Sequence, residues 1–295
     1  SNHTLNKGMR MLLKTSRRTF LKGLTLSGVA GSLGVWSFNA RSSLSLPVAA
    51  SLQGTQFDLT IGETAVNITG SERQAKTING GLPGPVLRWK EGDTITLKVK
   101  NRLNEQTSIH WHGIRLPLAM DGVPYVSQLP VLPGEYFDYS FITPDAGSYW
   151  YHPHVSSSEQ LGRGLVGPLI IEEREPSGFA HERTLCLKSW HLDEQGAFTA
   201  FSVPRDAARG GTPGRLSTIN GVHAPTLDLP AGEVVRLRVL NLDNSLTYRL
   251  NLPGADVRIY ALDGNPVAPR PLGKEYWLGP GMRIDLALRV PAAGI

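Results

Sequence analysis

The sequence predicts an all-β protein in which two tandem antiparallel β-sandwiches follow an N-terminal export signal. Three observations predict this class: an internal repeat, strict alternation of apolar and polar residues in both copies, and no long helical period after residue 50. With 295 residues, of which 40% are hydrophobic, the chain is long enough for about two domains of roughly 100–200 residues each.

Residues 1–50 have the composition of a twin-arginine signal peptide and linker. The stretch SRRTFLKGLTLSGVAGSLGVWSF places Arg17 and Arg18 ahead of a weakly hydrophobic run, and LPVAAS follows as a small-residue cleavage site. A transmembrane anchor is the alternative, but a span needs about 20 predominantly apolar residues. This run is shorter and diluted by glycine, so we expect twin-arginine export to the periplasm and no stable membrane anchor.

Two stretches after the signal repeat one pattern. TINGGLPGPVLRWKEGDTITLKVKN (77–101) and TINGVHAPTLDLPAGEVVRLRVLN (218–241) align with one single-residue gap. In the first copy Ile95, Leu97 and Val99 fall on one face of a strand and polar residues on the other. The second copy alternates in the same way, which predicts antiparallel strands with one face in the core and one in solvent.

The boundary between the two copies is predicted near EREPSGFAHE (173–182), where charged residues, Pro and Gly replace the apolar run GPLIIEE. We therefore expect the first sandwich over residues 51–175 and the second over residues 181–295. Both lengths fit a single sandwich of about 100 residues or a little more.

Charge and cysteine content exclude several classes of function. Seven Lys and Arg residues and no acidic residue lie in residues 1–50, so removing them from the net charge of +5 leaves −2. The remainder lacks the clustered positive charge of a nucleic-acid-binding surface. The single cysteine, Cys186, excludes an internal disulfide and CxxC motifs. Its leucine neighbours predict a small buried thiol.

Two His-x-His motifs, His110 with His112 and His152 with His154, are the strongest candidates for chemistry. Residues i and i+2 of a strand share a face about 6.5 Å apart, so each motif presents two imidazoles side by side. Two such strands can converge four ring nitrogens on a metal. Imidazole suits copper, zinc, iron and nickel, and the spacing does not choose among them.

The repeat supplies a comparison for these histidines. Carrying the alignment forward by 140 residues places His110 opposite Leu250 and His112 opposite Leu252. Two His-x-His pairs in one copy, with leucines at the matching positions of the other, favour metal ligation over a structural role.

The same motifs resemble a known family. IHWHG followed by YWYHPH is similar to the first two of the four copper-ligand motifs of the multicopper oxidases, whose units are cupredoxin-like Greek-key sandwiches. The run HWHGIRLPLAMDGVPYVSQLPVLPGEYFDYSF is most similar to the bacterial CumA-type branch, and the resemblance covers residues 16–295. It implies that His110 binds the type 2 copper and that His112, His152 and His154 bind the type 3 copper pair.

The resemblance also implies a reaction. Family members pass electrons from a reducing substrate to copper and reduce dioxygen to water, so the implied partners are dioxygen and a metal-ion or phenolic electron donor. Whether that donor is manganous, cuprous, ferrous or phenolic stays open. Asp121 occupies the acidic position that assists proton delivery in similar enzymes, whereas from the residues alone it equally fits a turn former in MDGVP.

The chain also departs from the family pattern. It lacks the two later ligand motifs and with them the type 1 copper site, since Cys186 has no histidine beside it. His181, His191 and His223 are scattered and are expected to be surface or structural residues. We expect an N-terminal portion of a longer enzyme, produced by truncation or a broken reading frame, that lacks the C-terminal cupredoxin domain.

Two other functions are considered. One is a periplasmic module that binds or sequesters copper, which the missing type 1 site favours. The other is a copper-free relative of the fold that serves as a scaffold or cell-division protein, which the presence of all four histidines disfavours.

Overall fold

The computed structural model describes residues 46, 50–201 and 204–292. The predicted export signal, with Arg17 and Arg18, lies outside the described residues except for Leu46 and Ala50. Among the described helices, none has both the length and the apolar character that crossing a membrane requires.

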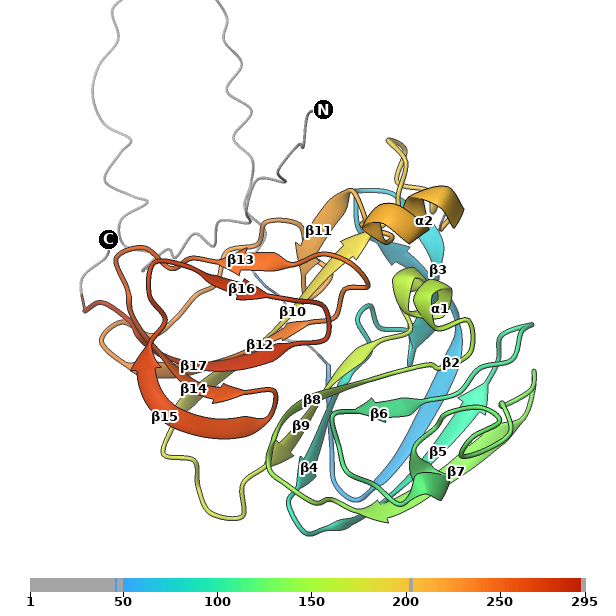
Figure 1. Cartoon of the computed structure of the whole chain (residues 1–295), viewed down its shortest axis with the longest axis horizontal. Helices are drawn as coiled ribbons and strands as arrows, with labels where there is room; N and C mark the ends of the chain where they lie inside the picture. The colour runs from blue at the N-terminus through green and yellow to red at the C-terminus, as the bar shows by residue number, and fades with distance from the viewer. Residues whose placement is uncertain (1–45, 47–49, 202–203, 293–295) are drawn as a thin grey trace, which may run out of the picture.

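The described chain consists mainly of β-strands (Figure 1). The first unit contains β1 (Ser51–Gln53), β2 (Gln56–Asn67), β3 (Glu72–Ile78), β4 (Val86–Lys90), β5 (Thr94–Asn101), β6 (His110–His112), β7 (Tyr136–Ile142), β8 (Gly147–His152) and β9 (Gly167–Glu172). The second unit contains β10 (His181–Trp190), β11 (Leu216–Ile219), β12 (Val234–Asn241), β13 (Tyr248–Leu250), β14 (Asp256–Leu262), β15 (Asn265–Pro271), β16 (Tyr276–Leu278) and β17 (Arg283–Arg289). Three short helices complete the description: η2 (Leu118–Met120), α1 (Ser157–Arg163) and α2 (Pro204–Gly210).

The first unit is a sandwich of two sheets. Its strands are ordered β1-β4-β9-β8-β6 in one sheet and β3-β2-β5-β7 in the other. Both sheets contribute alternate residues to one apolar core, and the predicted inward face of β5, formed by Ile95, Leu97 and Val99, is fully buried. This confirms the all-β class and the period-2 reading of this strand.

The pairing is mixed rather than purely antiparallel. Four pairs are parallel: β1 with β4, β2 with β5, β4 with β9, and β10 with β12. The other pairs between these strands are antiparallel. The partners in these parallel pairs are not consecutive strands. Greek-key connections cross between sheets and bring non-consecutive strands side by side, so the prediction of antiparallel strands holds for the other pairs and is wrong for these four.

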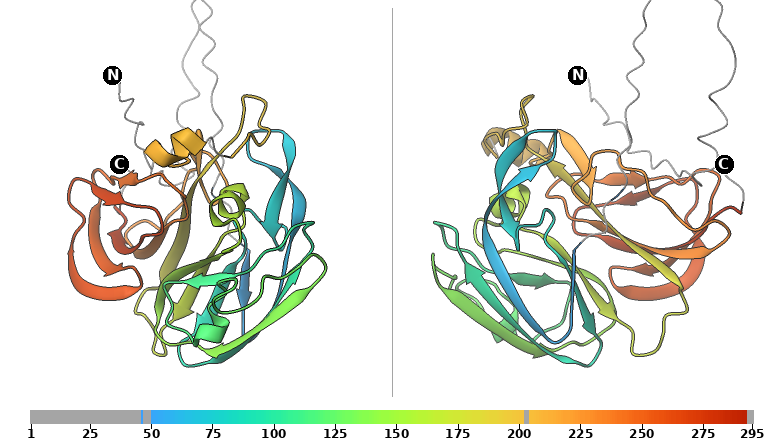
Figure 2. Two further views of the ribbon diagram at one scale, coloured as in Figure 1. Left: turned by 45° about the vertical axis from the view of Figure 1, so that its right-hand side comes forward. Right: turned by 180° about the vertical axis from the view of Figure 1, so that it is seen from behind.

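The second unit has a six-stranded sheet, β11-β10-β12-β17-β14-β15, and a two-stranded sheet, β13-β16, around a second apolar core. In β12 the alternation predicts solvent exposure for Arg236 and Arg238, but these side chains are only 2% and 1% exposed. β8 of the first unit lies against β12 and β17 and covers this face (Figure 1, Figure 2). The prediction failed because a face that is outer for one sandwich is buried between the two units.

Ion pairs and apolar packing join the two units: Nη1 of Arg236 in the second unit lies 2.7 Å from Oε1 of Glu173, which directly follows β9. Asp285 accepts hydrogen bonds from Arg236 Nη2 at 2.9 Å, Arg238 Nη1 at 3.1 Å and Ser148 Oγ at 2.6 Å. An apolar cluster beside this network joins residues of both units: Trp150, Leu161, Val166, Cys186, Leu240 and Leu242. Cys186 is a free and buried thiol, as predicted. Burial raises its pKa.

Candidate metal centre

The two His-x-His motifs lie on neighbouring strands of one sheet. β6 and β8 are antiparallel, and their register places His110 opposite His152 and His112 opposite Trp150. Between the two histidines of β6, Trp111 turns to the other face and is completely buried in the core of the first unit. Strand alternation thus buries Trp111 and aims both β6 histidines away from that core.

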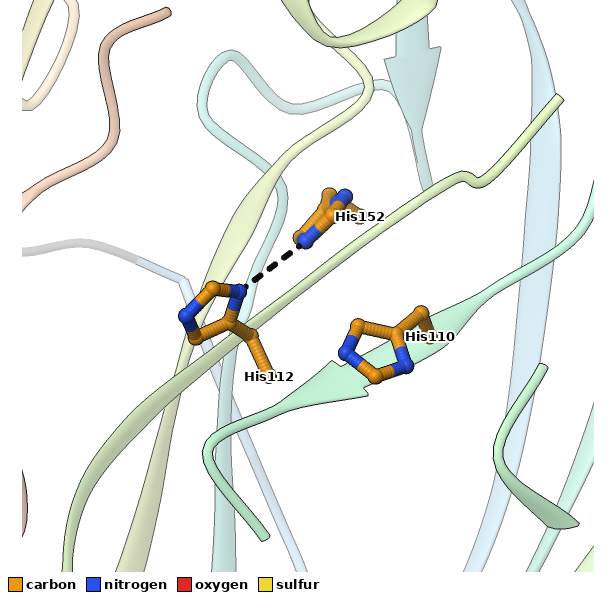
Figure 3. A group of neighbouring side chains, drawn as sticks. All are labelled: His110, His112 and His152. Carbon is orange, nitrogen blue, oxygen red and sulfur yellow. Dashed lines mark hydrogen bonds between the residues drawn. The ribbon is translucent and has the colours of Figure 1, made fainter. Parts of the chain in front are cut away.

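Three imidazoles converge as predicted (Figure 3). His110, His112 and His152 each offer a ring nitrogen, and these three atoms lie within 4.8 Å of one another. His154 follows the end of β8, and its ring centre lies 4.7 Å from that of His110 and 5.3 Å from that of His152. All four predicted histidines therefore gather at one place.

Backbone carbonyls orient two of the rings. Nδ1 of His110 lies 2.7 Å from the carbonyl oxygen of Asp121, and Nδ1 of His152 lies 3.0 Å from that of Pro153. A carbonyl oxygen only accepts hydrogen bonds, so each Nδ1 carries the proton and each Nε2 keeps its lone pair. His112 differs, because its Nδ1 faces Nε2 of His152 at 3.3 Å.

The surroundings favour the neutral form of His112, His152 and His154. Burial, followed by the nearby charge of Arg283, lowers the pKa of His112 to about 4. Burial also places the pKa of His152 well below its usual value and lowers that of His154, with His110 as the next cause for both. Neutral imidazoles have the free lone pair that a metal requires, so the centre is prepared for a cation near neutral pH.

Asp121 lies beside His110 at the end of η2. Besides the backbone contact, its Oδ1 is 3.4 Å from Nδ1 of His110, and the side chain is 32% exposed. Gly122 allows this approach: its φ is +76°, and a Cβ there would lie 1.7 Å from the carbonyl oxygen of Ile109. The MDG segment therefore forms a turn and also brings an acidic side chain to the centre.

The leucines aligned with His110 and His112 do not occupy equivalent positions in the second unit. Leu250 and Leu252 pack against the core of the second unit, whereas His110 and His112 face away from the core of the first. Positions that face away from the core in the first unit therefore face towards the core in the second unit. A shift of one residue exchanges the faces of a strand, which alignment of the letters alone does not reveal. The leucines are partly buried residues that pack against the core rather than surface replacements for the histidines.

Sequence reasoning missed one neighbour of the centre. Trp150 stacks on the rings of His112 and His152, at 4.4 Å and 4.3 Å between ring centres. It stands two residues before His152 on the same strand, so the period of 2 was a usable signal. The other histidines in the described part of the chain lie elsewhere: His181 begins β10, His191 packs on Phe201, and Nδ1 of His223 donates to the carbonyl oxygen of Ser217.

Comparisons with known sequences and structures all point to the same family. The sequence profile described as "Multicopper oxidase" matches residues 60–176. Copper resistance protein A of Escherichia coli is 52% identical over 305 residues, a match that covers 88% of this chain and 50% of that protein. The chain spans about half the length of the curated relatives it matches.

Solved structures agree. A multi-copper oxidase from Pseudomonas thermotolerans superposes with a TM-score of 0.80 at 64% identity, covering 83% of this chain and 60% of that one. The blue copper oxidase of Nitrosomonas europaea gives a TM-score of 0.68 at 30% identity, covering 81% and 76%. Fold, sequence and the gathered histidines lead to one assignment: the chain belongs to the multicopper oxidase family.

Proposed function

We propose that this chain supplies four histidine ligands of an oxygen-reducing copper centre. The protein would couple one-electron oxidation of a donor, a metal ion or a phenol, to the four-electron reduction of dioxygen to water. The observation that carries the proposal is the convergence of three ring nitrogens within 4.8 Å, with His154 beside them. Membership of a copper-binding family supports copper as the metal.

The residues present fit copper. The donors are neutral imidazoles, which suit copper among the transition metals, whereas calcium and magnesium need oxygen ligands. His110 is proposed to hold the type 2 ion, and His112, His152 and His154 to hold the type 3 pair. Bound copper would supply one-electron redox chemistry that no side chain of the cluster provides.

The chain's own groups would orient these ligands. The carbonyl oxygens of Asp121 and Pro153 hold the Nδ1 protons of His110 and His152, which directs both Nε2 lone pairs to the same side. Such hydrogen bonds behind a ligand fix its tautomer and ring orientation. The carboxylate of Asp121, 3.4 Å from His110 Nδ1 and partly exposed, would hold a proton between solvent and the centre.

Location and domain organisation complete the proposal. The twin-arginine pattern at Arg17 and Arg18 supports export to the periplasm. Two separate apolar cores support the division into cupredoxin domains over residues 51–175 and 181–295.

A second candidate function is copper binding without turnover, and Cys186 favours it. A type 1 centre requires an accessible thiolate with histidines beside it. The thiol of Cys186 is instead buried among Trp150, Val166 and Leu240, and burial raises its pKa.

Copper titration with variants tests the proposal. The protein should bind Cu(II), and the double variant His110→Leu/His112→Leu should lose that binding. His223→Leu is the matched control, because this exposed histidine lies outside the cluster and should leave uptake unchanged. Thermal unfolding should show that each variant is folded at the titration temperature. Equal copper uptake by the double variant and the control would contradict the ligand assignment.

A further inference from the structure

The ring of His112 is confined by a tryptophan. The indole of Trp150 lies 4.4 Å from this ring at an interplanar angle of 29°, and 4.3 Å from the ring of His152 at 27°. Trp150 is only 3% exposed and packs with Cys186, Leu240 and Leu242 of the second unit in the apolar cluster between the units. Because the indole cannot move freely, it restrains the planes of both imidazoles.

The second unit also meets the edge of this ring. A Cβ at Gly281 would lie 3.4 Å from Cζ2 of Trp150 and 3.7 Å from both Cε1 and Nε2 of His112. A side chain at Gly281 would therefore occupy the space beside the Cε1–Nε2 edge, while Nδ1 faces His152 on the other side.

Arg283 anchors the turn that carries Gly281. Its guanidinium donates to the carbonyl oxygens of Gly281 at 3.1 Å, Ser148 at 3.0 Å and Asp263 at 3.1 Å. A Cβ at Gly113, the residue after His112, would lie 2.4 Å from Nη2 of Arg283. The side chain thus joins the turn of the second unit to β8 and to the end of β6.

We propose that Trp150 and Arg283 are positioning residues that hold His112 with its Nδ1 lone pair directed at the metal, and that Gly281 lacks a side chain so that this ring keeps its place. The second unit, whose described residues supply none of the clustered histidines, becomes part of the metal centre through these contacts. The inference rests on the proposed function, because it concerns the same copper site. Its physical basis is that the lone pair lies in the plane of the ring, so any tilt of the plane directs it away from the metal.

Substitutions at Trp150 separate positioning from general packing. Outer partners of a ligand histidine change metal affinity by about 10–100-fold when they are mutated. Trp150→Leu removes the flat surface under both rings and should weaken Cu(II) binding by about that factor. Trp150→Phe retains an aromatic face and should recover most of the affinity.

Gly281 has a matched control in Gly232. The φ angles are +77° and +81°, so leucine at either position meets the same backbone strain. A Cβ at Gly232 has no atom within 4 Å, whereas one at Gly281 touches His112 and Trp150. Gly281→Leu should therefore weaken Cu(II) binding by about 10-fold or more, and Gly232→Leu should leave it unchanged.

The experiment measures Cu(II) affinity and the electron paramagnetic resonance spectrum of bound Cu(II) in the full chain. Circular dichroism fixes a temperature at which each variant is folded. Should Trp150→Leu not fold, Gly281→Leu carries the test against its control Gly232→Leu. Weaker binding with an altered spectrum in Trp150→Leu and Gly281→Leu, but not in Gly232→Leu, supports the proposal. Wild-type affinity and spectrum in folded Gly281→Leu and Trp150→Leu would overturn it. A wild-type protein that binds no Cu(II) would instead overturn the proposed function beneath it.

Discussion

Replacing Asp285 by alanine should destabilise the protein strongly, because this carboxylate is the buried counter-charge of two arginines. Asp285, Arg236 and Arg238 are all 3% exposed or less, and both guanidinium groups donate to Oδ2 of Asp285. The alanine variant leaves two buried positive charges and the hydroxyl of Ser148 without this acceptor.

The expected loss is about 3–5 kcal/mol, the range for breaking a buried ion pair by removing one partner. Glu173 and Glu182 remain within ion-pair distance of both arginines and limit the loss to that range. At about 2–4 °C per kcal/mol for a protein of this size, the melting temperature should fall by about 6–20 °C.

Chemical and thermal unfolding of the two proteins measure this loss. Glu275→Ala is the control, because Glu275 pairs with Arg249 on the surface, where the two side chains are 46% and 44% exposed. An exposed pair contributes about 0–1 kcal/mol, so this variant should unfold close to the wild type. Equal stability of Asp285→Ala and Glu275→Ala would refute the view that this buried network stabilises the protein.

Three further predictions concern other parts of the chain. Burial lowers the pKa of Lys188 to about 8, so between pH 8 and 10 the unfolded state binds more protons and stability contributed by this residue rises with pH. The stability of Lys188→Met relative to wild type should therefore be highest below pH 8 and fall by up to about 3 kcal/mol towards pH 10, and a constant difference would contradict this. Cys186 should react with iodoacetamide only after unfolding, and mass spectrometry that finds rapid labelling of the native protein would show its burial to be wrong. Arg17→Lys with Arg18→Lys should retain the protein in the cytoplasm, and periplasmic fractionation checks this.

The alternation of residues along single strands was enough to predict which faces of β5 and β6 are buried. Alternation in β5 identified the buried face formed by Ile95, Leu97 and Val99, and the His-x-His spacing placed two imidazoles on one face of β6. Both inferences need only the period of a strand.

Features that depend on how the two units meet were not predictable in this way. Arg236 and Arg238 alternate like solvent-facing residues, yet β8 of the other unit covers them. Gly281 reaches His112 from far along the chain, and no short pattern links the two. The histidine motifs indicated which residues form the centre, and only the packing of the units shows what holds them.

Anomalous X-ray diffraction at the copper absorption edge, from crystals soaked in Cu(II), tests the central claim most directly. Copper peaks should lie at bonding distance from Nε2 of His110 and, as separate ions, from Nδ1 of His112 and Nε2 of His152, with His154 beside them. Copper bound only elsewhere, for example at the exposed ring of His223, with nothing beside the three clustered nitrogens, would contradict the claim.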